Sequence, residues 1–196
     1  AAQGDADRAG ALPEDCLERW DAPSRYSPTV GSGSFLALVR LADLRRDRDP
    51  ERAEALLRRC LREHPAYLGS VLPLAAATIA RGVPAGQVIA EIEGAVAEPT
   101  PSVRFMLATA LYEAGEAEAA EPLYTAVVEA QPGNGGARLA LAETLLSTRR
   151  YAEAAAAAAA VADDDAFAVP AARSELIARV LAGEGAEGAA GRAARS

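Results

Sequence analysis

The feature that most constrains this chain is an internal period of 33 or 34 residues, which three independent series of positions share. A turn marked by proline or its substitute recurs at Pro65, Pro99, Pro132 and Ala166. The second series is Gly82, Gly115, Arg149 and Gly183, and the third is Ala75, Ala108 and Ala142. A period of this length predicts a chain of repeated supersecondary units, each of which buries its apolar face against its neighbours.

Within each period the pattern is that of two helices joined by a short turn. In residues 101–134, Thr100 is a candidate cap for a helix that starts at Pro101, where the missing backbone N–H does no harm. Gly115 marks the turn, because glycine commonly takes the left-handed conformation after a helix. The expected buried positions are Leu107, Ala108 and Leu111 in the first helix, and Ala119, Ala120, Leu123, Tyr124, Val127 and Val128 in the second.

Composition agrees with closely packed helices and leaves little room for catalysis. Of the 196 residues 50 are alanine, and aromatic residues make up only 5%, which argues against a β-sandwich or a β-barrel. We expect the alanines that recur with the period to lie where helices cross. The chain has one histidine, two cysteines and one methionine, so we expect no catalytic site, no metal and no cofactor.

The recurring residues resemble the tetratricopeptide repeat family. The resemblance is carried by the pairs Leu74-Ala75, Leu107-Ala108 and Leu141-Ala142, by Ala53, Ala120 and Ala154 early in the second helices, and by the terminal prolines Pro65, Pro99 and Pro132. It implies an all-α fold, a right-handed α-solenoid of stacked antiparallel helix hairpins. One departure is Gln87, which takes the small-residue place in the second repeat.

The resemblance also implies a domain organisation. It covers residues 35–190, as an array of four repeats with a terminal repeat or capping helix. Residues 1–34, with scattered glycines and prolines, are expected to form a polar linker or N-terminal extension. Residues 191–196 are expected to be a flexible tail.

In this family the first helices line a concave surface, and ligand contacts come from alternate turns of those helices. Carried over to this chain, the resemblance implies a partner-binding groove made of Leu72, Ala76, Ile79, Phe105, Thr109, Tyr112, Leu139, Glu143 and Leu146. Such a groove is mainly apolar and suits an amphipathic helix or an extended apolar peptide. Arg104 and Arg138, one repeat apart, are candidate contacts for an acidic group of the partner, against the alternative that they pair with the chain's own glutamates.

Smaller motifs favour structural interpretations. His64 ends a helix before Pro65 and suits the helix dipole, while Cys60, four residues earlier, falls on the expected core face. Residues 163–165 are three aspartates in succession, without the alternate spacing of a calcium loop, so we interpret them as a solvated turn. Residues 31–33, Gly-Ser-Gly, have neither a preceding strand nor a following Gly-Lys, which favours flexible chain over a phosphate loop.

The net charge of −8 and the apolar runs limit the class of partner. Binding to duplex nucleic acid needs a basic stripe, which we do not find, so nucleic acid is not expected as a partner. The longest apolar runs, residues 71–80 and 154–162, are about half the length that spans a bilayer, so no membrane insertion is expected. Cys16 and Cys60 do not suggest a disulfide framework, and reduced thiols favour a cytoplasmic location.

Two functions remain open. The first is a non-catalytic scaffold that binds a protein or peptide partner in its groove, with self-association through the array ends as an additional expectation. The second is an accessory region of an enzyme, because residues 25–33 (RYSPTVGSG) and the alanine-rich, lysine-free composition resemble the segment that follows a bacterial family 2 glycosyltransferase domain. The polar start and the missing initiator methionine fit a piece of a longer chain, in which the region would position an acceptor or partner.

Overall fold

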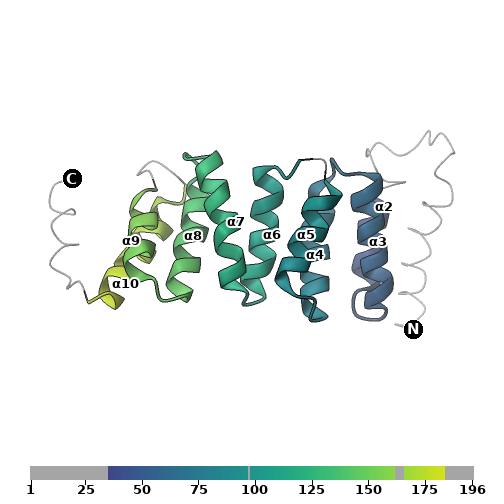
Figure 1. Ribbon diagram of the computed structural model, residues 1–196, viewed down its shortest axis with the longest axis horizontal. Helices are drawn as coiled ribbons and strands as arrows, with labels where there is room; N and C mark the ends of the chain where they lie inside the picture. The colour runs from purple at the N-terminus through teal and green to yellow at the C-terminus, as the bar shows by residue number, and fades with distance from the viewer. Residues whose placement is uncertain (1–34, 97, 162–165, 184–196) are drawn as a thin grey trace. The chain divides into compact units, whose positions relative to one another are not determined.

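The computed structural model describes residues 35–96, 98–161 and 166–183, and all regular secondary structure in these ranges is helical (Figure 1). The elements are α2 (Phe35–Arg45), α3 (Pro50–Glu63), the short 3₁₀ helix η1 (Leu68–Ser70), α4 (Val71–Ala80), α5 (Ala85–Ala95), α6 (Pro101–Glu113), α7 (Ala117–Ala130), α8 (Gly135–Ser147), α9 (Tyr151–Ala159) and α10 (Ala168–Leu181). The predicted fold class, all-α with stacked helix hairpins, is confirmed. The expected linker 1–34, the tail 191–196, the aspartates 163–165 and Cys16 lie outside the described residues.

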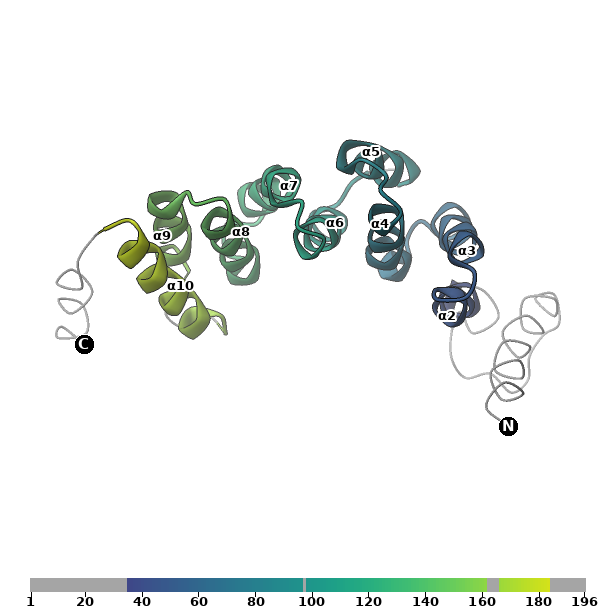
Figure 2. The same ribbon diagram turned by 90° about the horizontal axis from the view of Figure 1, so that it is seen from below.

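The chain forms two compact units, residues 1–99 and 100–196, which we describe one at a time. In the first unit α2 packs on α3, α4 packs on α5, and α3 also packs on α4. In the second unit α6 packs on α7, and α8 packs on α9. Helix α7 also packs on α8, and this contact joins the two hairpins. Helix α10 packs on both α8 and α9. Figure 2 shows α6, α8 and α10 along one side of the second unit, with α7 and α9 along the other.

Helix starts follow the predicted capping chemistry. Thr100 Oγ1 accepts a hydrogen bond from the Val103 N–H at 3.3 Å, and Pro101 is the first residue of α6. In the next hairpin Asn134 Oδ1 accepts from the Ala137 N–H at 3.0 Å. These side chains satisfy backbone donors that have no partner within the first turn of a helix. The caps therefore fix where α6 and α8 begin.

The hairpin turns place a left-handed residue at the predicted period. Gly82, Gly115 and Gly183 have φ of 81°, 87° and 81°, and Arg149 has φ of 62°. Arg149 is the one non-glycine residue with positive φ among the described residues. For a side chain with a Cβ atom this conformation costs about 1–2 kcal/mol, so the turn between α8 and α9 is strained relative to its equivalents.

Replacing Arg149 by glycine is expected to raise the free energy of unfolding by about 1 kcal/mol, because glycine adopts the left-handed conformation without the steric cost. The matched reverse change is Gly115→Ala, which should lower the free energy of unfolding by a similar amount. A Cβ atom at Gly115 would meet no atom within 4 Å, so only the backbone conformation is tested. Denaturant unfolding followed by circular dichroism measures both. A less stable Arg149→Gly protein would contradict this account of the turn.

The recurring alanines lie in the core, as predicted. Ala75, Ala108 and Ala142 are each 0% exposed, as are Ala120 and Ala154 in the second helices. Because these side chains are short, the backbones of paired helices can approach closely. In α5 the corresponding position is Gln87, whose side chain is exposed. The larger side chain at this position therefore does not have to fit into the core.

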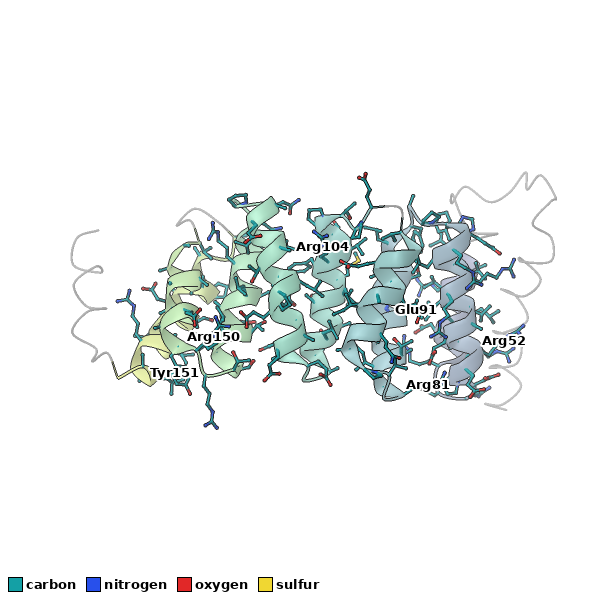
Figure 3. The ribbon with its side chains drawn as sticks, viewed as in Figure 1. Arg52, Arg81, Glu91, Arg104, Arg150 and Tyr151 are labelled. Atoms are coloured by element: carbon teal, nitrogen blue, oxygen red, sulfur yellow. The ribbon has the colours of Figure 1, made fainter. Side chains whose placement is uncertain are left out.

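A buried carboxylate ties α3 to α4 and α5 in the first unit. Glu54 is 1% exposed; its Oε2 accepts from Arg58 Nη1 at 2.7 Å, and its Oε1 accepts from Arg81 Nη1 at 3.0 Å. Arg58 Nε also donates to Glu91 Oε1 at 2.5 Å, across a sequence separation of 33 residues. Figure 3 labels Arg81 and Glu91 within this network. Two successive hairpins are thus joined by charged hydrogen bonds as well as by apolar packing.

A similar link joins the hairpins of the second unit. Arg150, which precedes α9, donates through Nη1 to Glu121 Oε1 of α7 at 2.5 Å and also pairs with Glu153 (Figure 3). The carboxylates of Glu153 and Glu121 raise the pKa of Arg150, so its guanidinium stays charged. Arg150 and Glu153 are 41% and 58% exposed and Glu121 is half-buried, so this link stabilises less than the one at the fully buried Glu54.

Candidate functional site

One side of the second unit carries apolar and aromatic residues that do not enter the core. In α6 these are Phe105, Thr109 and Tyr112, which are half-buried, whereas Leu107 and Leu111 on the opposite side are 0% exposed. In α8 the equivalent residues are Leu139, Glu143 and Leu146, also half-buried. The six positions follow a spacing of i, i+4, i+7 in each helix, which keeps them on one face.

Helix α10 continues this surface with residues that our sequence analysis did not assign to the groove. The same period, counted 34 residues on from α8, reaches Arg173, Ile177 and Val180. Ile177 is 44% exposed and Val180 is 57% exposed. The repeat period was the signal that could have found them. We call the nine residues the α6–α8–α10 face: Phe105, Thr109, Tyr112, Leu139, Glu143, Leu146, Arg173, Ile177 and Val180.

The α6 part of this face is held by hydrogen bonds and ring packing. The Tyr124 hydroxyl of α7 donates to Thr109 Oγ1 at 3.1 Å, and Thr109 Oγ1 donates to the Phe105 carbonyl at 2.8 Å. The rings of Phe105 and Tyr124 meet edge to face, with centroids 5.6 Å apart and planes at 68°. Tyr124 itself is 2% exposed, as predicted for a core position. A rigid aromatic base of this kind loses little entropy when a partner binds.

The same region holds carboxylates that act on two phenols. Burial raises the pKa of the Tyr112 hydroxyl, and the Glu143 carboxylate raises it further. Burial is also the main cause of the raised pKa of Tyr124, to which Glu113, Tyr112 and Glu143 contribute, while the hydrogen bond to Thr109 lowers it. Glu143 forms no ion pair or side-chain hydrogen bond with any residue that the structure describes. A carboxylate near two phenols therefore lies on a mainly apolar face.

The predicted groove residues of α4 belong to the first unit. Leu72 and Ala76 are exposed there, and Ile79 is half-buried. The same unit has a pocket of about 190 Å³, lined by Val39, Arg40, Ala42, Asp43, Arg46, Ala53, Leu57, Pro73 and Ala77. Its base is aliphatic, and Arg46 pairs with Asp43 at 2.5 Å. None of the three predicted α4 positions lines this pocket, which instead uses Pro73 and Ala77 of the same helix.

The two arginines proposed for an acidic partner group occupy equivalent places on α6 and α8. Arg138 Nε donates to the Pro132 carbonyl at 2.8 Å, which ties it to the turn before its own helix. Its observed partner is therefore a backbone oxygen rather than a glutamate. Arg104 is half-buried on α6 and also has an interaction within the chain (Figure 3). Neither residue belongs to the α6–α8–α10 face.

The other candidate residues have structural surroundings. His64 follows the last residue of α3, its backbone N–H donates to the Cys60 carbonyl at 2.8 Å, and its ring meets Phe35 edge to face at 5.5 Å. Cys60 is 0% exposed, which confirms its predicted core position, and burial raises the pKa of its thiol. A buried, protonated thiol is a poor nucleophile.

Two further findings concern the described ranges only. In the parts of the chain whose structure is described, no group of three His, Cys, Asp or Glu side chains could hold a metal ion. None of the helices described is long and apolar enough to cross a bilayer.

Comparisons with known proteins support the family resemblance. Residues 101–180, which span α6 to α10, match a family model described as tetratricopeptide repeat. The match supports the predicted family for the part of the chain that holds the α6–α8–α10 face. No curated protein matches the chain.

Solved structures extend the similarity to most of the chain. The crystal structure of the MamA protein aligns with a TM-score of 0.53 and 16% identity, over 76% of this chain and 83% of that one. The structure of YrrB, described as a TPR protein with an unusual peptide-binding site, aligns with a TM-score of 0.52 and 16% identity, over 89% and 84%. At these identities the similarity concerns the fold alone.

Proposed function

We propose that this chain is an interaction scaffold, and that the α6–α8–α10 face of its second unit binds a protein or peptide partner. The observation that carries the proposal is the contrast in burial along α6. Leu107 and Leu111 are 0% exposed in the core, while Phe105 and Tyr112 on another face of the helix are only half-buried. Apolar and aromatic residues that stay partly or fully exposed at equivalent places on three helices are typical of a surface that another molecule covers.

Two observations limit the class of partner. The face is long and mainly apolar, and its side chains recur at turns of parallel helices, which suits a peptide segment rather than a small metabolite. YrrB, which shares the fold, is described as having a peptide-binding site, so the architecture is compatible with this use. The proposed alternative, an accessory role beside a glycosyltransferase domain, rests on the alanine-rich, lysine-free composition and on residues 25–33, which lie outside the described residues.

Phe105→Arg is expected to weaken peptide binding at least tenfold, because it places a charge on the apolar part of the face. The assay uses the full chain to select binders from displayed random peptides of about 12 residues, and then measures affinity by fluorescence anisotropy. Ile177→Arg is a second variant, since Ile177 is 44% exposed and its replacement should leave the fold intact. Ala130→Arg, exposed near the end of α7, is the matched control.

Circular dichroism and thermal unfolding verify that each variant keeps its helices. Loss of binding in both face variants, with retention in Ala130→Arg, supports the proposal. Selected peptides that bind both face variants as tightly as the parent would refute it, as would a failure to select any peptide.

A further inference from the structure

We propose that the α6–α8–α10 face recognises one basic side chain, lysine or arginine, of a bound peptide, with the Glu143 carboxylate as its counter-ion and the Tyr112 hydroxyl beside it. This inference rests on the proposed function, because it specifies the chemistry of the partner of the same face. Glu143 and Tyr112 are polar groups on a mainly apolar surface, and the partner would supply the cation that they bind.

The first argument is that Glu143 differs from the other glutamates with comparable burial. Among the described residues, the buried or half-buried glutamates other than Glu143 all have partners, which are arginines for Glu54, Glu91, Glu121 and Glu175 and an interaction within the chain for Glu93. Glu143 is half-buried too, yet forms no ion pair or side-chain hydrogen bond with a described residue. A carboxylate that is partly removed from water gains most from a charged donor.

The second argument is the chemistry around this carboxylate. The Glu143 carboxylate raises the pKa of two phenols, Tyr112 on α6 and Tyr124 on α7, and Glu113 also raises that of Tyr124. Arg173, the one basic residue of the face, is exposed on α10 and forms no ion pair with Glu143. The charged groups that act on these two phenols, Glu113 and Glu143, are both negative.

The third argument is that a cation finds acceptors there besides Glu143. The Tyr112 hydroxyl makes no hydrogen bond with any described residue, so its oxygen is available to an ammonium or guanidinium group. The faces of tyrosine rings also attract cations. The Tyr124 hydroxyl, by contrast, already donates to Thr109 at 3.1 Å. Of the two phenols, Tyr112 is therefore the one whose hydroxyl can form a hydrogen bond with a ligand.

The apolar surroundings define the rest of the peptide. Counted by the repeat period, Glu143 lies between Thr109 on α6 and Ile177 on α10, and Leu139 and Leu146 flank it on α8. A peptide that fills this face therefore has aliphatic or aromatic residues on both sides of its basic residue. A uniformly basic peptide would lack the apolar contacts, and an acidic peptide would be repelled.

The test uses the full chain and the displayed random peptides described above. Peptides selected on the parent protein are expected to carry one lysine or arginine between apolar residues. Glu143→Gln keeps the shape of the side chain and should weaken the binding of these peptides about tenfold. Glu143→Lys should reverse the preference toward aspartate or glutamate. The matched control is Glu129→Gln, an exposed glutamate on α7.

The outcomes distinguish this inference from the proposed function. If peptides are selected and lose affinity in Phe105→Arg, but show no basic preference or bind Glu143→Gln as tightly as the parent, the cation site is refuted and the proposed function stands. If no peptides are selected, or Phe105→Arg has no effect, the proposed function fails as well. An unaltered preference in Glu143→Lys also refutes the cation site.

Discussion

Removing both arginine partners of Glu54, in the double variant Arg58→Met and Arg81→Met, is expected to lower the free energy of unfolding by about 3 kcal/mol. The carboxylate is 1% exposed, so without Arg58 and Arg81 its charge would lie in the core with neither of its hydrogen bonds. We place the effect at the lower end of the range for buried pairs because the arginine side chains are 32% and 45% exposed. Chemical denaturation of the full chain, followed by circular dichroism, measures the change.

Two further variants separate burial of charge from loss of packing. Adding Glu54→Leu to the double variant should recover most of the lost stability, because an apolar side chain has no charge to compensate. Arg59→Met breaks an exposed pair with Glu63, whose side chains are both 48% exposed, and should cost no more than about 0.5 kcal/mol. A double variant as stable as Arg59→Met would show that the Glu54 network contributes no more than a surface ion pair.

Ala108→Leu is expected to lower the free energy of unfolding by about 1–3 kcal/mol, because the added carbons have no space between α6 and α7. Ala108 is 0% exposed, and so is its counterpart Ala142, for which we expect the same effect. The matched control is Ala114→Leu, at the exposed end of α6. Thermal unfolding that shows the Ala108 and Ala142 variants as stable as the parent would mean that the crossings tolerate larger side chains.

The helices and turns could be predicted from the sequence because their signals are local. A left-handed residue ends the first helix at Gly82, Gly115, Arg149 and Gly183, and each was a member of one sequence series. The Thr100 cap and the Pro101 start depend on neighbouring residues alone. Burial of the alanines followed from the period, since repeated units place equivalent residues in equivalent surroundings.

Contacts between distant side chains could not be predicted in the same way. Arg58 pairs with Glu91 across 33 residues, but the period alone does not say which of the many glutamates an arginine reaches. The hydrogen bond from Tyr124 to Thr109 depends on side-chain conformations in two helices. For the candidate site, the sequence predicted positions on α6 and α8 from a family resemblance, and the structure adds the contacts that distinguish Glu143.

Helix α9 differs from the other helices of the second unit in its composition. It has nine residues, seven of them alanine, and it follows the strained turn at Arg149. Alanine buries little area, so α9 gains less from packing than α7 does with Leu123, Tyr124 and Val127. Local unfolding begins where packing is weakest, and α9 supports both α8 and α10. A ligand that contacts α8 and α10 together would therefore suppress the opening of α9, and part of its binding energy would appear as slower amide exchange in that helix.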